Sequence, residues 1–235
     1  MKLAIMQPYF FPYIGYWQLI NAVDKFVVYD QIEYTKKGWI NRNQILLNGS
    51  SKIITLPIKK DSDWLNINER RVADVWDKQR TKLLNLIKAA YGKAPEYKRV
   101  IPLIEECLNT DQANLFEFLY RTINLIARFL YIDTEIIISS NVDVSSELKS
   151  QDRVIETCRR LEASQYINPQ GGVELYKSDA FQKHSIDLKF LFTNSITYNQ
   201  YENEFIPYLS IIDVLMFNST DMVSNLLNQY KLQPG

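Results

Sequence analysis

The sequence predicts an α/β fold in which helices flank a mostly parallel sheet. Two observations support this: short β-branched or aromatic runs recur along the chain, and stretches with apolar residues at helical spacing separate them. Strands that alternate with helices favour parallel pairing through right-handed crossovers. A third observation, an unbroken series of helical patterns over about residues 74–131, adds a helical insert to this Rossmann-like sheet. No composition shift, repeat or linker divides the chain, so residues 1–235 are expected to form a single α/β domain.

Six short runs are predicted to be strands of this sheet. Each is apolar or β-branched, and each is followed by a polar residue or a proline. The predicted strands are Leu3–Met6, Phe26–Tyr29, Ile53–Leu56, Glu135–Ser139, Gln165–Ile167 and Leu188–Phe192.

Eight stretches are predicted to be helices. In the insert, Gly92 and Pro95 end the first helical pattern, and Thr110 or Asp111 is the expected cap of the last. The predicted helices are Ile14–Ala22, Asp74–Tyr91, Glu96–Leu108, Asp111–Tyr131, Asp152–Glu162, Gly172–Gln182, Ile211–Phe217 and Asp221–Tyr230.

The charge balance argues against nucleic-acid binding, because 27 basic side chains are matched by 27 acidic ones and no basic cluster stands out. No apolar run approaches the ~20 residues that span a bilayer. Gln7 and Pro8 interrupt the apolar start of the chain, which is too short for a signal peptide. Cys107 and Cys158 fall at core-facing helix positions, as free thiols do in a reducing compartment. We therefore expect a cytoplasmic protein that contacts neither nucleic acid nor membrane.

The loop after the first predicted strand is the first candidate for ligand binding. Ligands of open parallel sheets bind at the carboxyl ends of the strands. Two prolines stiffen this loop, and its residues Gln7, Tyr9, Tyr13 and Tyr16 offer an amide, hydroxyls and stacking faces. Gly15 allows close approach near a helix start, where free N–H groups attract anions. The alternative is a rigid aromatic plug over the core.

A second polar set follows the second predicted strand. Arg42 suits a phosphate or carboxylate, and the flanking amides of Asn41 and Asn43 are candidate catalytic groups. Asp30 directly follows the strand, where it orients Arg42, binds a ribose hydroxyl or caps a turn. The alternative for Arg42 is a surface arginine in a solvated hairpin.

Two further candidates follow later strands. Gly171 and Gly172 precede a predicted helix and could cradle an anion there, or they form an ordinary turn. Tyr176 lies in that helix as a candidate ligand contact. Tyr198 and Gln200 follow the last predicted strand, as a ligand contact and a catalytic candidate respectively.

The sequence also limits the chemistry. His184 is the one histidine and falls at the far end of a helix, so a serine or cysteine triad and a histidine-rich zinc site are disfavoured. No metal ligands are therefore predicted. Acid–base work falls to Asp, Glu, Tyr or Lys, with Asp30 and Asp213 as candidates. Asp213 begins a helix, and capping that helix is its alternative role.

Many of these residues together resemble the WbqC-like protein family, and the likeness extends from residue 1 to about residue 217. The matching residues are Met6-Gln7-Pro8-Tyr9, Pro12-Tyr13, Gly15-Tyr16, Asp24, Phe26, Asp30, Gly38-Trp39-Ile40-Asn41-Arg42-Asn43, Thr55-Leu56-Pro57, Tyr91, Ala94-Pro95, Ser139-Ser140, Tyr176, Tyr198, Gln200, Phe205-Ile206-Pro207 and Leu209-Ser210-Ile211-Ile212-Asp213.

The resemblance implies a role around nucleotide-linked sugars in bacterial surface-polysaccharide (O-antigen) biosynthesis. Two departures stand out: the stretch 168–172 replaces a glycine-serine turn common in relatives, and Gln79 stands where a histidine is common. If that histidine is catalytic, this protein uses another base. The opening loop also resembles that of nucleotidyltransferase-type Rossmann folds, but tyrosines occupy the places of their histidines.

Three functions follow from these considerations. The first is a transferase that acylates or aminoacylates a nucleotide-linked amino sugar, using an acyl thioester donor or an acyl or aminoacyl carrier protein. Arg42 and the Gly171-Gly172 helix start would take the diphosphate, and Asp30 would orient or deprotonate the amine. The second is a ligase or nucleotidyl-transfer enzyme that uses ATP with magnesium. The third is a non-catalytic binding or scaffold protein of glycan assembly.

Overall fold

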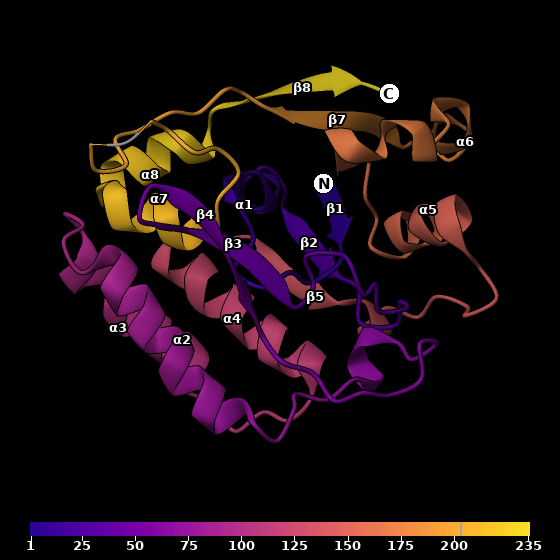
Figure 1. Cartoon of the computed structure of the whole chain (residues 1–235). Helices are drawn as coiled ribbons and strands as arrows, with labels where there is room; N and C mark the ends of the chain where they lie inside the picture. Colours follow the sequence, from indigo (N-terminus) through magenta and orange to yellow (C-terminus); the bar gives the residue numbers. More distant parts are fainter. Residues whose placement is uncertain (203) are drawn as a thin grey trace.

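A six-stranded sheet runs through the centre of the computed structural model, which describes residues 1–202 and 204–235 (Figure 1). Its strands lie in the order β5-β2-β1-β6-β7-β8. The first five are parallel, and β8 pairs antiparallel with β7. The strands are β1 (Lys2–Met6), β2 (Lys25–Val28), β5 (Glu135–Ile138), β6 (Gln165–Pro169), β7 (Asp187–Thr193) and β8 (Tyr230–Pro234). The predicted mostly parallel, Rossmann-like sheet is confirmed.

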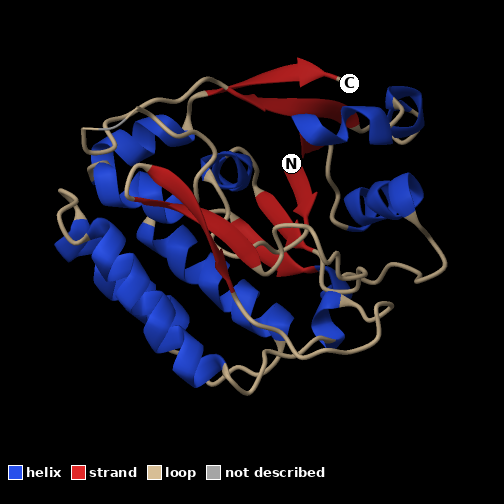
Figure 2. Ribbon diagram, viewed as in Figure 1, coloured by secondary structure: helices blue, strands red, loops and turns tan. Residues whose placement is uncertain are grey.

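Helices cover both faces of the sheet (Figure 2). Side chains of a strand point alternately to opposite faces, so β1 contributes to two apolar cores. Leu3 and Ile5 lie in one core and Ala4 in the other. The helices of the first core are α5 (Ser150–Arg160) and α6 (Ser178–Gln182). The second core includes α1 (Ile14–Asn21), α4 (Leu115–Phe129), α7 (Ile211–Phe217) and α8 (Thr220–Leu227), together with helices of the connection between β2 and β5. Strands buried on both faces explain the continuous apolar runs in the sequence.

The long connection between β2 and β5 forms the expected insert. It contains the helices α2 (Trp76–Tyr91), α3 (Tyr97–Leu108) and α4, which lie together in the lower left of Figure 1. It also contains a 3₁₀ turn, η1 (Ile67–Glu69), and an antiparallel hairpin of β3 (Arg42–Leu47) and β4 (Ser50–Thr55). A second 3₁₀ turn, η2 (Ser139–Asn141), follows β5.

The prediction that Ile53–Leu56 is a strand of the main sheet is wrong. Most of this segment belongs to β4, which pairs only with β3 in the separate hairpin. The face of β4 that carries Ile53 is exposed, whereas Ile54 is buried against the core. A strand buried on only one face suits an antiparallel hairpin.

Three helix predictions differ from the structure by more than two residues at a boundary. The stretch predicted as one helix, Gly172–Gln182, is a 3₁₀ segment, η3 (Gln170–Leu175), followed after a break by α6. The last predicted helix ends at Leu227, and the chain returns to the sheet as β8. The cap of α4 is Asn114, whose side chain accepts a hydrogen bond from the Glu117 N–H, rather than Thr110 or Asp111.

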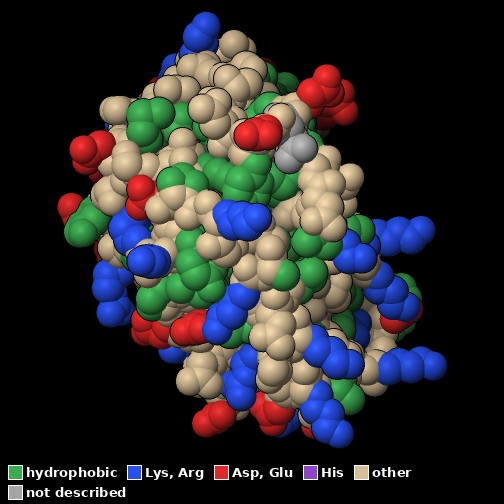
Figure 3. All heavy atoms as spheres, turned by 60° about the vertical axis from the view of Figure 1, so that its left-hand side comes forward, with side chains coloured by type: hydrophobic (Ala, Val, Ile, Leu, Met, Phe, Trp, Pro, Cys, Tyr) green, Lys and Arg blue, Asp and Glu red, His purple; other side chains and the backbone are tan. Residues whose placement is uncertain are grey.

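The surface carries both signs of charge. Figure 3 shows acidic and basic side chains on one face, with basic side chains gathering toward its lower and right-hand parts. Ion pairs such as Lys36–Asp63 and Lys88–Glu105 join the two signs. Exposed pairs of this kind contribute little to stability, so the fold depends on the two apolar cores.

Candidate functional site

The carboxyl ends of the parallel strands lie together at one end of the sheet, which we call the sheet edge. The order in which the strands are added changes direction at β1. From β1 the chain proceeds to β2 on one side, whereas β6 and β7 follow on the other. β1 pairs with β2 as far as Met6↔Val28, but it pairs with β6 only at Lys2↔Gln165 and Leu3↔Tyr166. The carboxyl-terminal halves of β1 and β6 therefore diverge, at the position where open α/β sheets bind ligands.

A pocket of about 530 Å³ opens at this edge, beside the end of β7. It is surrounded by the start of α1, the start of η3, and the stretches 193–198 and 205–209. The lining residues are Tyr13, Ile14, Gln170, Thr193, Asn194, Ser195, Ile196, Thr197, Tyr198, Phe205, Pro207, Tyr208, Leu209 and Val214. Of the predicted ligand contacts, the structure brings Tyr13 and Tyr198 together here.

The lining contains no Asp, Glu, Lys, Arg or His among the described residues. Aromatic rings lie beside hydroxyl groups such as those of Thr193, Ser195 and Thr197. At the start of α1 no side chain caps the helix and no acidic residue occupies the first turn. The partial positive charge of this helix end is therefore not offset locally. The pocket suits a ligand that combines a hydroxyl-rich, uncharged body with an anionic group.

Gly15 determines the shape of the wall near α1. A Cβ atom at this position would lie 2.3 Å from the Tyr13 hydroxyl and 2.8 Å from Thr193 Oγ1. The atoms that approach Gly15 closely are thus those of the Tyr13 and Thr193 side chains in the pocket wall. A side chain at position 15 would push Tyr13 away from Thr193.

The rest of the opening loop supports the plug interpretation. Phe10 and Phe11 are fully buried, and Tyr16 is 3% exposed. The Tyr16 hydroxyl donates to the Gln7 carbonyl at 3.0 Å, and burial raises its pKa well above the usual value. Tyr9 packs against Tyr16 with ring centroids 5.7 Å apart and is partly buried. Within this loop, Tyr13 is the residue that faces the pocket.

Asp213 lies behind the pocket wall and is fully buried. Its Oδ2 accepts hydrogen bonds from the Tyr198 hydroxyl and Gln200 Nε2, both at 2.7 Å, and its Oδ1 accepts one from the Tyr91 hydroxyl at 2.8 Å. Burial raises the pKa of the carboxyl, and the three donated bonds oppose that rise. The helix cap is Ser210, whose hydroxyl accepts from the Ile212 N–H, so Asp213 has a different role from the capping alternative.

Asp30 lies at the end of β2, away from the pocket lining. Its Oδ1 accepts from the Ser139 hydroxyl at 2.6 Å and the Ser140 N–H at 3.0 Å, and its Oδ2 accepts from Asn68 Nδ2 at 3.1 Å. These bonds join the end of β2 to η2 and η1. All of them stabilise the connections around the sheet edge.

The three amides predicted to be catalytic are buried and bonded within the protein. Asn41 accepts from the Tyr34 hydroxyl and donates to the Leu56 carbonyl. Asn43 donates to the Phe10 and Phe11 carbonyls at 3.0 and 2.8 Å. Gln200 bonds both Asp213 and the backbone of Ile206. The structure places Asn43 on β3 and Asn41 directly before it, and neither residue lines the pocket.

Arg42 lies on β3 and does not line the pocket. Its guanidinium donates to the Gly38 carbonyl at 3.0 Å and to the Lys37 carbonyl, and it lies 5.8 Å from the centre of the Trp39 ring. The guanidinium thus closes the turn that precedes the hairpin. The structure does not place it where it would take the diphosphate of a ligand in the pocket.

The Gly171-Gly172 pair does not precede an α-helix, because both glycines lie inside the 3₁₀ segment η3. A Cβ atom on Gly172 would lie 1.8 Å from Asn168 Nδ2, so this glycine makes room for a buried side chain. Tyr176 packs edge-on against Tyr166 and Phe181 in the core that contains α5 and α6. Within this stretch, the residue that reaches the pocket is Gln170.

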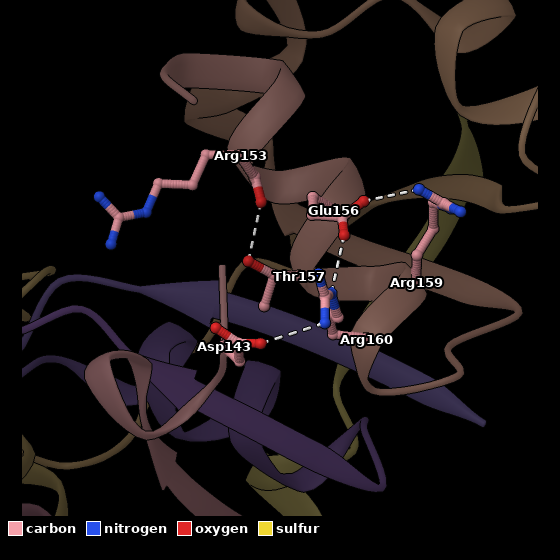
Figure 4. Close-up of polar contacts among 6 residues, drawn as sticks. All are labelled: Asp143, Arg153, Glu156, Thr157, Arg159 and Arg160. Carbon is pink, nitrogen blue, oxygen red and sulfur yellow. Dashed lines mark hydrogen bonds and ion pairs between the residues drawn. The ribbon is translucent and has the colours of Figure 1, made fainter. Parts of the chain in front are cut away.

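Arg153 is a cation at the same sheet edge that sequence reasoning missed. It lies in the first turn of α5, donates to Gln31 Oε1 at 3.3 Å and sits 5.7 Å from the centre of the Tyr29 ring. In Figure 4 its guanidinium points away from Glu156, which pairs with Arg159 and Arg160. No ion pair of Arg153 is found in the part of the chain that the structure describes. The signal in the sequence that could have identified Arg153 was its position near the start of a predicted helix.

Other reactive groups lie away from this edge. His184 is exposed and precedes β7, so it lies at the amino ends of the strands. Cys107 and Cys158 are buried free thiols, and burial raises the pKa of Cys158 to about 12. Across residues 1–202 and 204–235, no group of three or more His, Cys, Asp or Glu side chains is arranged to hold a metal ion.

Comparison with known proteins places the chain in a family. The family model described as WbqC-like protein family matches residues 7–225. The chain belongs to the WbqC-like family. Among its relatives, the WbqC-like chain is 28% identical over 221 residues to "Uncharacterized protein Rv1507c" of Mycobacterium tuberculosis (strain ATCC 25618 / H37Rv), covering 92% of this chain and 93% of that protein. No solved structure matches the chain.

The family assignment predicted from the sequence is therefore confirmed, while the reaction is not identified by the comparisons. The WbqC-like chain contains, in its described residues, no helix that combines the length and apolar character needed to cross a bilayer. The pocket beside β7 is the feature that bears most directly on its function.

Proposed function

We propose that this WbqC-like protein is a cytoplasmic transferase that acylates or aminoacylates the amino group of a nucleotide-linked amino sugar in surface-polysaccharide (O-antigen) biosynthesis. The observation that carries the proposal is the pocket of about 530 Å³, whose described lining combines aromatic rings with hydroxyl and amide groups and contains no charged side chain. Its size lies within the range of small-molecule sites, which run from about 300 to 1,000 Å³.

The wall chemistry supports a sugar. A sugar ring has C–H faces that pack on aromatic rings, and Tyr13, Phe205 and Tyr208 supply such rings. Its hydroxyls need partners with both donor and acceptor capacity. Thr193 and Ser195 provide these as side-chain hydroxyls, which rotate to suit either role.

The nucleotide portion would extend toward the start of α1. Its phosphates would meet the uncapped N–H groups of that helix, next to Tyr13. This assignment replaces Arg42 and the Gly171-Gly172 pair, which lie outside the pocket lining. Arg153, at the same sheet edge, is a candidate for a side-chain cation.

The reaction consistent with this ligand is acyl transfer from a thioester on coenzyme A or on a carrier protein. The sugar amine attacks the carbonyl carbon, the C–N bond forms and the C–S bond breaks. The proton lost by the amine neutralises the leaving thiolate. Binding both partners at the open edge of the sheet would supply the proximity on which such a reaction depends.

A thermal-shift series tests the proposal. Uridine- and thymidine-linked amino sugars, the free nucleotides, coenzyme A, and ATP with magnesium are each added to the protein. A ligand at 100 times its dissociation constant stabilises the folded state by about 2.7 kcal/mol. We expect a selective rise in melting temperature with an amino-sugar nucleotide. A rise with ATP and magnesium alone would instead support the ligase.

A second candidate is a non-catalytic sugar-binding protein of glycan assembly. The observation that favours it is the burial of Asp30, Asn41, Asn43 and Gln200, whose polar groups are bonded within the protein. It predicts the same thermal shift without turnover. Detection by mass spectrometry of an acylated sugar nucleotide would exclude it.

A further inference from the structure

The charge state of Asp213 follows from the direction of the bonds around it. The Leu46 N–H donates to the Tyr91 oxygen at 2.8 Å, so the Tyr91 proton is directed to the carboxylate. Gln200 Oε1 accepts from the Ile206 N–H, so its amide nitrogen faces Asp213. With three donors directed at it, the carboxylate acts only as an acceptor, which is the pattern of its ionised form.

This buried charge forms no ion pair with a cationic side chain of the described residues. None of the ion pairs in residues 1–202 and 204–235 involves Asp213. Its position in the first turn of α7 offsets part of the charge through the helix dipole. A buried carboxylate without a counter-ion produces a negative potential that extends to nearby surfaces, because the interior screens charge less than water does.

Tyr198 connects this charge to the pocket. Tyr198 lines the pocket, and its hydroxyl donates to Asp213 Oδ2 at 2.7 Å. Because the single hydroxyl proton is committed to Asp213, the Tyr198 oxygen can only accept a hydrogen bond from a ligand. The described lining of the pocket contains no charged side chain, so the Asp213 carboxylate behind Tyr198 contributes to the potential at this end.

We propose that the Tyr198–Asp213 pair forms an acceptor end of the pocket that selects a ligand with a protonated amine over the same ligand with a hydroxyl. The ammonium group donates to the Tyr198 oxygen, with the Asp213 carboxylate one hydrogen bond behind it. The inference deepens the proposed function, on which the link to amino sugars rests, by assigning the amine to one end of the pocket. The uncapped start of α1 then takes the anionic part of the ligand.

The pair also provides a route for the proton that the amine must lose before it attacks. The Tyr198 proton moves to Asp213 Oδ2 as the ammonium proton moves to the Tyr198 oxygen. No proton is gained or lost in this exchange, and the amine becomes neutral. Asp213 acts through Tyr198 and is therefore a positioning residue.

The selectivity is tested by ligand-observed NMR titration of glucosamine and glucose at about pH 6, where primary amines are protonated. The two sugars differ at one substituent. We expect the wild-type protein to bind glucosamine about tenfold more tightly than glucose. Tyr198→Phe and Asp213→Asn should each reduce that ratio to about one.

Tyr91→Phe is the matched control, because it removes a hydrogen bond to Asp213 from a residue that does not line the pocket. It should retain the preference for glucosamine. A variant that merely loosens the fold would weaken both sugars together and leave the ratio unchanged. If Asp213→Asn does not fold, the comparison of Tyr198→Phe with Tyr91→Phe decides the question.

Cyclohexylammonium and cyclohexanol separate this inference from the proposed function. If neither sugar binds but the ammonium compound is preferred over the alcohol, the acceptor end is correct and the sugar assignment is wrong. Equal binding within each pair, or a preference that survives both Tyr198→Phe and Asp213→Asn, would overturn the inference.

Discussion

Asn43 illustrates how a polar residue in this chain can stabilise a site without entering it. Its amide nitrogen donates to the carbonyls of Phe10 and Phe11, and Phe11 has a positive φ of 45°. The hairpin therefore holds the opening loop in a conformation that a free chain would rarely adopt. That loop leads directly to Tyr13 in the pocket wall.

Asn43→Ala should lower the free energy of unfolding by about 2 kcal/mol, since it removes both bonds and leaves two buried carbonyls without that donor. Urea denaturation checks this value. Asn85→Ala, at an exposed position within α2, is the control and should not destabilise the protein. An effect of Asn43→Ala no larger than that of the control would contradict the structural role.

At the scale of single residues, the sequence was least able to distinguish side chains that bind a ligand from side chains that stabilise the fold. Asn41, Asn43 and Gln200 carry the same amide whether they bind a ligand or the backbone, and the choice depends on contacts distant in sequence. Asp213 offered a stronger signal. It is a carboxylate within the otherwise apolar stretch Ile211–Phe217, and a charge in such a stretch needs buried partners.

The raised pKa of Asp213 predicts a pH dependence. The folded protein holds the proton more tightly than the unfolded chain, whose aspartates titrate near the reference value of 3.8. The contribution of Asp213 to stability is therefore fully present below that value and is lost as pH rises through the folded pKa. The unfolding free energy of the wild type relative to Asp213→Asn should fall from about pH 4 upward. A rising difference, measured by urea denaturation at several pH values, would mean that the pKa is depressed.

At the scale of elements, the turn residues of the β3–β4 hairpin indicate the hairpin in the sequence, whereas the apolar runs alone do not. Asn48 and Gly49 connect the two strands, with φ values of 51° and 73°. Asn-Gly between strands is a strong hairpin indicator, because both central residues of that turn need positive φ. β3 itself begins with Arg42, Asn43 and Gln44, so its polar start concealed the strand.

Gly49→Ala should reduce stability by about 1 kcal/mol, since a Cβ atom is unfavourable at positive φ. Asn48→Gly is the matched change in the same turn and should alter stability by only a few tenths of a kcal/mol. Chemical denaturation of the two variants gives the comparison. Equal losses in both would argue against strain at position 49 as the cause.

The Gly171-Gly172 segment shows a different limit at this scale. A glycine pair before a predicted helix looks the same whether the following turn is α-helical or 3₁₀. The deciding contact is the approach of Asn168 to Gly172, which is a tertiary packing detail. Such a detail is absent from local sequence patterns, so the sequence alone could not show that these glycines lie inside a 3₁₀ segment.

For the whole molecule, the position of the pocket was predictable from the order of elements alone. Parallel strands joined through helices place all their carboxyl ends on one edge, and residues that follow several strands must meet there. Tyr13, after β1, and Tyr198, after β7, do so. The order of strands was not predictable, because it depends on which neighbour each strand pairs with.

Thr197→Trp should weaken binding of an amino-sugar nucleotide at least tenfold, because the indole would fill the pocket from an exposed position. Unfolding free energy should change by less than about 0.5 kcal/mol. Lys183→Trp, at an exposed position near the opposite edge of the sheet, should leave binding unchanged. Calorimetric titration distinguishes the two, and unaltered affinity in Thr197→Trp would relocate the ligand.

The hydrogen bonds around Asp213 have a spectroscopic consequence. The Leu46 amide donates to Tyr91, which donates to the same carboxylate that holds Tyr198. Polarisation of one bond in such a chain changes the others. The amide resonance of Leu46, on a hairpin strand that does not line the pocket, thus becomes a remote reporter of occupancy. Its chemical shift should change when a ligand fills the pocket, and Tyr91→Phe should abolish that change.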